Sequence, residues 1–369
     1  MSKKITIIGC SISGSIAAFI LAKSGFDVSV YEQNPKERIH QKICANIVTS
    51  SFIRLMKEIG LDTESIIKRK FAMAEFYSQS NSVKIPVTDY EIDRQRLLHI
   101  AIIAAQKFGA KFYFNSRVIE FEDTPSGINI TVQKTNEKNP QMESFDYCIG
   151  ADGSLSTVSR KSGLWQNRKF WLAIQSSVSK SKISCHVNES AYKIFFIPHL
   201  GYYSYIFPSG ENYTIGILAD PQKAKARFSE FCDFIGVKNC KIESALIPIP
   251  KKLNTKKGNI FIIGDAACHT KFSGGGIVPS IEAAIALGDI LRNGKWKRMN
   301  SLSREIMMHQ MITKILSKLS AQEFDNLFMV ANKKDIKIQS RDEMRKWAVS
   351  TLIKNPGLIL LGRKLFNLF

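Results

Sequence analysis

The chain has 369 residues, 44% hydrophobic and 23% charged, a composition that excludes a disordered or low-complexity protein and predicts two or three structural units. The formal net charge of +20 suits the phosphates of lipids or nucleic acids, but a generally lysine-rich composition would explain it equally well, and no nucleic-acid motif is present. Seven scattered cysteines without a CxxC pair argue against a disulfide framework and a zinc site, so we expect a cytoplasmic protein without a bound metal.

The N-terminal third alternates buried strands with helices. Lys4–Ile8 and Asp27–Tyr31 are short apolar runs typical of parallel strands, and Ser13–Lys23 between them is predicted to be a helix. Glycines and serines interrupt the apolar N-terminal stretch, so we expect neither a signal peptide nor a membrane-spanning helix there. Further along, the pattern predicts a helix over 93–108 and strands over 111–121, 127–133 and 145–149.

The middle of the chain changes character. From about Lys169 to Pro250, aromatic and β-branched residues alternate, which predicts a β-rich insertion with an aromatic face. The expected strands cover 191–197, 202–207 and 213–218, and only 221–234 resembles a helix. A buried strand returns at 259–263 and a helix at 277–291, after which the chain is predicted to be helical and basic from about Ser301.

The first chemical motif is Gly9-Cys10-Ser11-Ile12-Ser13-Gly14, between a strand and a helix. A dinucleotide-binding turn needs glycines for its tightness, for close approach to a pyrophosphate and for helix–strand packing, and here Ser11 replaces the middle glycine. Glu32 ends the second strand, 18 residues after Gly14, where an acid can accept hydrogen bonds from a ribose. The motif therefore predicts dinucleotide binding at the N-terminus of the helix.

Two further glycine–aspartate motifs follow strands. The first is Cys148-Ile149-Gly150-Ala151-Asp152-Gly153-Ser154, and the second is Ile263-Gly264-Asp265-Ala266-Ala267, followed by Gly274-Gly275-Gly276-Ile277. Each alone could be an ordinary turn. A carboxylate such as Asp265 at a strand end can bind a ribityl hydroxyl, and the glycine-rich stretch opens a helix whose N–H groups can meet a phosphate or a flavin ring.

Together, the three motifs resemble the FAD-dependent hydroxylase and reductase superfamily over roughly residues 3–292. The resemblance implies non-covalent FAD, and it implies no tightly held nicotinamide, because a second glycine fingerprint is absent. It places Glu32 on the adenosine ribose, Asp265 near the ribityl chain, and the backbone of Ser13 and Gly276-Ile277 at the phosphates and ring. It also implies cofactor contacts for Gly9, Ser11, Gly14, Arg94, Val118 and Asp152.

Two more segments narrow the resemblance to the geranylgeranyl reductase family. Gln41-Lys42-Ile43-Cys44-Ala45-Asn46 is similar to its cysteine loop beside the flavin, and 203–210, Tyr-Ser-Tyr-Ile-Phe-Pro-Ser-Gly, is similar to its isoprenoid-cavity motif. Asp93-Arg94, opening a helix, also matches. The chain departs from the family at Tyr205, which replaces a tryptophan, at Ala45-Asn46, which replaces a glycine pair, and in the loop 268–273, which is a residue short and lacks a proline.

The narrower resemblance implies roles for the residues of both segments. Cys44 and Ala45 would lie against the isoalloxazine ring, with Cys44 tuning its reactivity; otherwise Cys44 is a small buried hydrophobe. Tyr203, Tyr205, Phe207 and Pro208 would line a tunnel for a prenyl chain; otherwise the alternation marks a strand face packed on a core. His269 is a candidate acid, but we expect a satisfied or exposed histidine there.

The predicted fold class is α/β: a Rossmann-like FAD-binding domain, a β-sheet-rich substrate domain and a C-terminal helical region. The FAD-binding domain is expected over 1–168, with an excursion into the substrate domain near 71–90, and again over 257–292. The substrate domain is expected over 169–256, and the helical region over 293–369.

The expected activity, by resemblance, is reduction of the double bonds of geranylgeranyl chains in archaeal-type membrane lipids or their precursors. Alternatives are a flavin monooxygenase of an aromatic or polyene compound and a non-catalytic lipid-binding flavoprotein. The expected partners are an isoprenoid lipid and an electron donor of unknown kind, without nucleic acid. The last fifth of the chain, from Leu291, carries 16 Lys plus Arg against 6 Asp plus Glu.

A basic amphipathic pattern closes the chain. Leu358, Leu361, Leu365 and Phe369 recur at helical spacing, with Arg363, Lys364 and Asn367 at other angles and Arg345, Lys346 and Trp347 upstream. Such a helix can lie in the headgroup region, so we expect peripheral contact with the inner face of the membrane. The alternative is a terminal helix folded back over the core.

Overall fold

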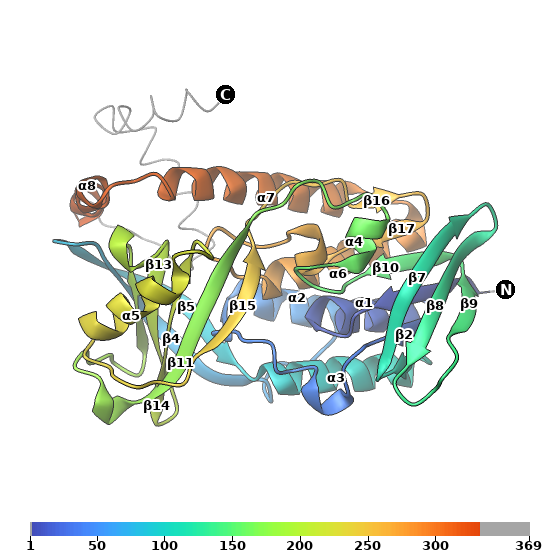
Figure 1. Cartoon of the computed structure of the whole chain (residues 1–369), viewed down its shortest axis with the longest axis horizontal. Coiled ribbons are helices and arrows are strands. Elements are labelled where there is room, and N and C mark those ends of the chain that lie inside the picture. The colour runs from blue at the N-terminus through green and yellow to red at the C-terminus, as the bar shows by residue number, and fades with distance from the viewer. Residues whose placement is uncertain (1, 333–369) are drawn as a thin grey trace.

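The computed structural model describes residues 2–332, and one half of it is built on a six-stranded sheet (Figure 1). The strand order is β16-β17-β10-β1-β2-β6, and all neighbours are parallel except β16 and β17. The strands are β1 (Lys4–Ile8), β2 (Asp27–Tyr31), β6 (Lys111–Tyr113), β10 (Tyr147–Gly150), β16 (Lys256–Lys257) and β17 (Ile260–Ile262). This is the Rossmann-like layer that the sequence predicts.

The two faces of this sheet are covered differently. Ile5, Ile7, Val28 and Val30 pack against helices on one face, whereas Ile8, Tyr31, Cys148 and Ile260 pack against a three-stranded sheet on the other. The helices are α1 (Ile12–Lys23), α2 (Ser51–Ile59), α3 (Arg94–Lys107) and α6 (Ile277–Asn293). The small sheet is β7 (Ser116–Thr124), β8 (Gly127–Lys134) and β9 (Gln141–Phe145).

An eight-stranded sheet forms the second half, in the order β15-β11-β14-β13-β12-β4-β5-β3. Its strands are β3 (Ile47–Thr49), β4 (Ile67–Tyr77), β5 (Ser82–Ile92), β11 (Phe170–Ser179), β12 (Ala191–Phe195), β13 (Tyr203–Ser209), β14 (Asn212–Ala219) and β15 (Glu243–Pro248). Helix α5 (Ala224–Phe234) packs on one face with Ile206 and Ile215. The sheet draws strands from both 47–92 and 170–248, so the chain enters this half twice.

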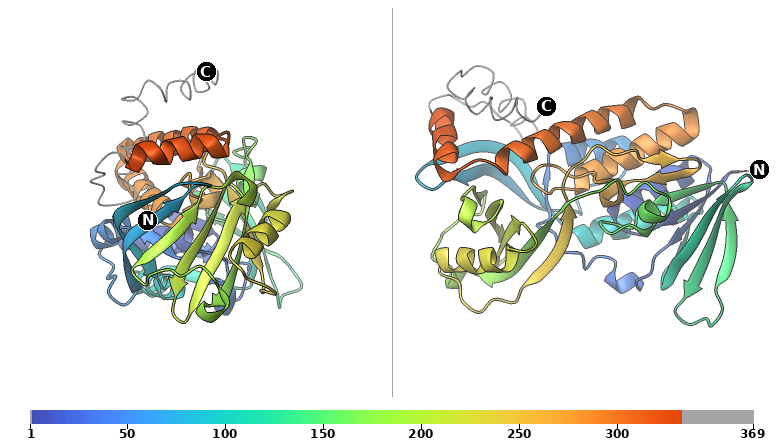
Figure 2. Two further views of the ribbon diagram at one scale, coloured as in Figure 1. Left: turned by 90° about the vertical axis from the view of Figure 1, so that its left-hand side faces the viewer. Right: turned by 45° about the horizontal axis from the view of Figure 1, so that its top comes forward.

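Helix α7 (Lys297–Leu316) runs from the Rossmann-like half to the large sheet, where α8 (Ala321–Asn332) follows it (Figure 1). Helix α7 packs against α6 beside the Rossmann-like sheet, and α8 packs against the aromatic face of the large sheet. Figures 1 and 2 show α8 and the β7–β9 sheet at opposite ends of the molecule. The shorter helices are α4 (Thr157–Lys161), η1 (Lys36–Arg38), η2 (Lys180–Lys182), η3 (Pro198–Leu200) and η4 (Gly264–Ala267). Within residues 2–332, no helix is long and apolar enough to cross a bilayer.

The predicted fold class is confirmed, but two expected strands are wrong in detail. The strand expected over 111–121 is two strands, because Asn115 adopts φ 54° and turns the chain from β6 of one sheet into β7 of another. Phe145, expected in the strand over 145–149, ends β9 instead, and β10 starts at Tyr147. The C-terminal helix expected over 357–369 and the basic residues around Trp347 lie outside the described residues.

Candidate cofactor and substrate site

A cleft of about 430 Å³ lies at the carboxyl ends of β1, β2 and β10, where open α/β sheets bind their ligands. Its walls come from segments that lie far apart in the chain, from Ile8 to Ser280. Among the sequence-predicted cofactor residues, the cleft is lined by Gly9, Ser11, Ser13, Glu32, Cys44, Arg94, Val118, Asp152, Asp265, Gly276 and Ile277. Gly14 and Ala45 are not part of its wall.

The turn from β1 into α1 requires its two outer glycines. Gly9 has φ +101°, and a Cβ there would lie 2.5 Å from the Ala151 carbonyl oxygen. A Cβ at Gly14 would lie 2.0 Å from the Gly9 oxygen, so Gly14 acts by letting the helix pack closely rather than by facing the cleft. The tight turn brings the N-terminus of α1, with Ser11 at its cap position, to the cleft.

Ser11, which replaces the middle glycine, has a partner in Arg94. Arg94 donates from Nη2 to Ser11 Oγ at 2.9 Å and from Nη1 to the His40 carbonyl at 2.8 Å. Its side chain is buried, and this burial lowers the pKa of the guanidinium. The Arg94 guanidinium therefore links the glycine turn, through Ser11, to the segment that carries Lys42 and Cys44.

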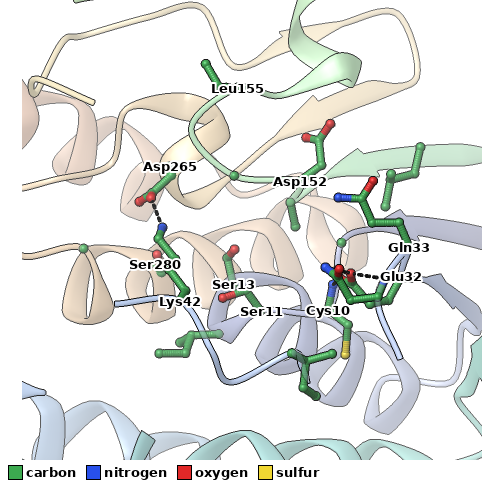
Figure 3. Close-up of a pocket in the computed structure, with 18 of the residues that line it drawn as sticks. Cys10, Ser11, Ser13, Glu32, Gln33, Lys42, Asp152, Leu155, Asp265 and Ser280 are labelled. Atoms are coloured by element: carbon green, nitrogen blue, oxygen red, sulfur yellow. Dashed lines mark hydrogen bonds and ion pairs between the residues drawn. The ribbon is translucent and has the colours of Figure 1, made fainter. Parts of the chain in front are cut away.

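Glu32 is fixed at the end of β2 beside the glycine turn (Figure 3). One carboxylate oxygen accepts the Cys10 N–H at 2.9 Å, and the other accepts from the backbone and side chain of Asn34, both at 2.8 Å. These bonds hold an anionic acceptor next to the start of α1, the arrangement that an adenosine ribose would need.

Asp265 faces Lys42 across the cleft, and the two side chains form an ion pair (Figure 3). Ser154 Oγ also donates to this carboxylate, at 3.2 Å. A Cβ at Gly276 would lie 3.1 Å from the other carboxylate oxygen, so the glycine keeps the carboxylate and the start of α6 close together. Lys42 was not among the predicted site residues, because nothing in the sequence connects it to an aspartate 223 residues away.

Asp152 lines the cleft, but its carboxylate holds the following turn. It accepts from Ser156 Oγ at 2.6 Å and from the N–H groups of Thr157 and Val158 at 2.7 and 3.0 Å. Burial raises its pKa, and these bonds oppose that rise. Its observed contacts thus fix the start of α4, and a direct contact with the cofactor stays a prediction.

A second cavity, of about 510 Å³, lies over the aromatic face of the large sheet. Tyr203, Tyr205 and Phe207 alternate along β13, share this face and line the cavity. Pro208, the fourth predicted substrate residue, is buried but does not line it. The cavity and the cofactor cleft share six wall residues: Ile43, Cys44, Ile247, Gly274, Gly276 and Ile277.

Cys44 stands at this junction. Its half-buried Sγ accepts the Asn46 N–H at 3.3 Å, and Ala45 continues into the wall of the second cavity. The loop therefore separates the polar cleft from the apolar cavity, the place that the resemblance implies for a flavin ring.

His269 is neither exposed nor satisfied. Its ring is buried, and Nδ1 has no hydrogen-bond partner in the part of the chain that the structure describes. Burial lowers its pKa from 6.5 to about 4, so the imidazole is neutral at pH 7. A neutral imidazole outside both cavity walls is poorly suited to supply a proton to a substrate.

Comparison with known proteins identifies FAD as the cofactor of this protein. The model of the FAD-binding domain family matches residues 2–234, more than half of the chain. The glycine turn, the fixed Glu32 carboxylate and the Asp265–Gly276 pair fit FAD, because they offer a helix N-terminus for the pyrophosphate and acceptors for sugar hydroxyls.

Individual relatives include reductases and monooxygenases. The digeranylgeranylglycerophospholipid reductase of Methanococcus vannielii is 24% identical over 312 residues, covering 78% of this chain and 76% of the relative. An FAD-dependent monooxygenase of Sarocladium schorii is 31% identical over 172 residues, covering 42% and 38%. A geranylgeranyl bacteriochlorophyll reductase-like structure from Thermoplasma acidophilum shares the fold, with TM-score 0.81, 16% identity and coverage of 100% and 99%.

Proposed function

This chain belongs to the FAD-binding domain family, and we propose that it uses FAD to saturate the double bonds of geranylgeranyl chains in archaeal-type membrane lipids or their precursors. FAD binding and oxidoreductase activity follow from the family. The substrate class is our proposal, and the observation that carries it is the apolar, aromatic-walled cavity that meets the cofactor cleft at Cys44.

The cavity suits a long unsaturated chain for physical reasons. Phe76, Ile194, Tyr203 and Phe207 offer apolar and aromatic surface, and burial of a prenyl chain against it is worth about 0.8 kcal/mol for each methylene group. The relative from Methanococcus vannielii, whose name includes a digeranylgeranyl lipid, matches over 78% of the chain. The monooxygenase relative matches less than half.

In this proposal FAD, once reduced by the electron donor, would supply a hydride to one alkene carbon, and a proton would complete the addition. The chain's own residues bind and orient. Glu32, Asp265 and the start of α1 would hold the cofactor, and the 42–46 loop would border the reacting region. The β13 aromatics would press the substrate toward it and exclude water. The electron donor is a further partner of unknown kind.

Cys44 is proposed to adjust the reactivity of the ring that it borders. Cys44→Ser keeps the side-chain volume and changes the sulfur, so we expect a shifted flavin absorption spectrum and slower lipid reduction. The variant Cys240→Ser, on a half-buried cysteine that lines neither cavity, is the control. A Cys44→Ser protein with unchanged spectrum and turnover would refute this role.

The decisive experiment is anaerobic. The purified protein is loaded with FAD, reduced chemically and mixed with a digeranylgeranyl glycerophospholipid, and the lipid is analysed by mass spectrometry. We expect mass gains in steps of two hydrogens. The alternative, a monooxygenase, is favoured by the 31% identity of the Sarocladium schorii relative over 172 residues. It predicts no anaerobic product, but oxygen consumption and addition of one oxygen atom to an aromatic or polyene compound.

A further inference from the structure

Part of the wall of the substrate cavity is polar and exposed to solvent. Arg54 on α2 and Glu305 on α7 line it, and their side chains are 63% and 38% exposed. Glu282 on α6 lines the same cavity close enough to both to feel their charges, and burial raises its pKa. Charged groups at a solvent-exposed rim can accept a hydrated headgroup but not a hydrocarbon chain.

Another part of the wall is closed by stacked aromatic rings. Phe196, directly after β12, lines the cavity together with Phe76 of β4, and their ring centroids are 6.3 Å apart. Behind Phe196 stand Phe324 and Phe328 of α8, with centroids 5.4 and 6.2 Å from its ring. Neither α8 residue reaches the cavity, so Phe196 is a partition between the cavity and α8.

Helix α8 is fastened in place from its polar side. Asp325 accepts from Ser78 Oγ and from the Ser80 N–H, both at the tip of the β4–β5 hairpin, and Asn332 donates to the Ser82 carbonyl at 2.7 Å. Figure 1 shows α8 at the end of the molecule beside the β4, β5 and β13 strands. The backing of Phe196 is therefore anchored to the sheet that forms the cavity floor.

We propose that the substrate enters this cavity tail first, with its polar headgroup at the Arg54–Glu305 rim, and that Phe196, backed by α8, sets the longest chain that fits. This inference rests on the proposed function, because it assigns the hydrocarbon tail of an amphiphile to the cavity. It makes Phe196 a determinant of chain length and places it outside the chemical step.

The test uses the full-length protein loaded with FAD and four glycerophosphate ethers that carry geranyl, farnesyl, geranylgeranyl or geranylfarnesyl chains. Retained lipid is measured by equilibrium dialysis and mass spectrometry, and turnover is measured under anaerobic conditions. Phe196→Ala should raise the preference for the longest chain over the next shorter one by about tenfold, the ratio expected when two further methylene groups are buried. Phe196→Trp should move the preference toward shorter chains.

Phe195→Leu is the matched control, since Phe195 faces the opposite side, where it stacks on Tyr77 and packs at a tilt against Phe231. It should lower the melting temperature and leave the preferred length unchanged. Should Phe196→Ala lose FAD, Phe196→Leu replaces it. If Phe196→Ala (or its Leu replacement) and Phe196→Trp both leave the preferred chain length unchanged, the inference is overturned. Lipid reduction by the wild type would still support the proposed function in that case. If the Phe196 variants change the chain length that binds best but no lipid is reduced, the role of Phe196 is supported and the proposed reductase activity is refuted.

Discussion

Glu32 offers the most direct test of the cofactor site at the level of single residues. Its carboxylate is held in place by Cys10 and Asn34 beside the glycine turn. Glu32→Ala removes two ribose acceptors, and since a hydrogen bond to a charged group is worth about 1.5–3 kcal/mol, FAD affinity should fall by roughly tenfold to a hundredfold. Fluorescence titration of the apoprotein measures this. Exposed Glu37→Ala is the control, and a Glu32→Ala protein that purifies fully yellow would contradict the role.

His269 predicts a pH dependence of stability. Its folded pKa of about 4 lies below the ordinary 6.5, so the unfolded chain binds the proton more readily. The free energy of unfolding should therefore fall as the pH drops from 6.5 to 4, by roughly 3 kcal/mol in total. Urea titrations of wild type and His269→Asn should differ in this window. His186→Asn, at an exposed histidine, should behave as wild type; an equal acid response of the His269 variant would refute the assignment.

The site residues differ in how far the sequence could predict them. Glycines, Glu32 and Asp265 were predictable because their local motifs follow strands. The Lys42–Asp265 pair and the Arg94–Ser11 bond were not, since both join segments distant in the chain. The direction of the Asp152 carboxylate, toward α4, depends on Ser156 and two backbone N–H groups, whose geometry exists only after folding.

At the scale of elements, strand β13 allows its two faces to be tested separately. Tyr203 lines the cavity and donates to the Ser273 carbonyl at 2.6 Å, whereas Ile206 is buried on the α5 side. Tyr203→Ala should raise KM for the lipid about tenfold with FAD retained, because apolar wall is lost. Ile206→Ala should instead destabilise the fold by about 2–5 kcal/mol and leave KM unchanged. Thermal melts and steady-state kinetics distinguish the two variants. If both variants lose FAD and stability to the same extent, β13 has a purely structural role.

The elements that the sequence predicts best are those whose apolar residues follow a clear pattern. Buried parallel strands and α1, α3 and α6 carry continuous apolar runs or helical spacing, so their existence was evident. The β4–β5 hairpin was expected only as an excursion near 71–90, and the structure extends this sheet to β3 at Ile47. Lysines on the exposed positions of β4 and β5 weaken their hydrophobic pattern, and the partnership of β4 with β12 joins residues more than a hundred apart.

At the scale of the whole molecule, the arrangement of the two sheets explains the proposed chemistry. The chain crosses from the Rossmann-like half to the large sheet twice, and the 42–46 loop and the 274–277 turn lie between them. These crossings place a polar cleft and an apolar cavity on the two sides of one wall. A cofactor held in the cleft could then reach a substrate that never leaves an apolar environment.

A lipid substrate also requires contact with a bilayer, and the chain's charge suggests how. The last fifth is strongly basic, and 357–369 combines leucines at helical spacing with Arg363 and Lys364. Each cation near an anionic surface is worth about 1 kcal/mol, so a few could hold the protein reversibly. These residues lie outside the described part, so this prediction rests on the sequence.

Salt and truncation test this membrane contact. The full chain should bind vesicles of phosphatidylglycerol in phosphatidylcholine at low ionic strength and release them as salt rises, because screening shortens the reach of surface charges to about 8 Å at physiological salt. Deletion of 357–369 should abolish vesicle co-sedimentation and leave FAD binding intact, whereas neutral vesicles should bind neither protein. If the truncated chain loses FAD and unfolds, the segment is part of the folded core, and the membrane hypothesis loses its main support.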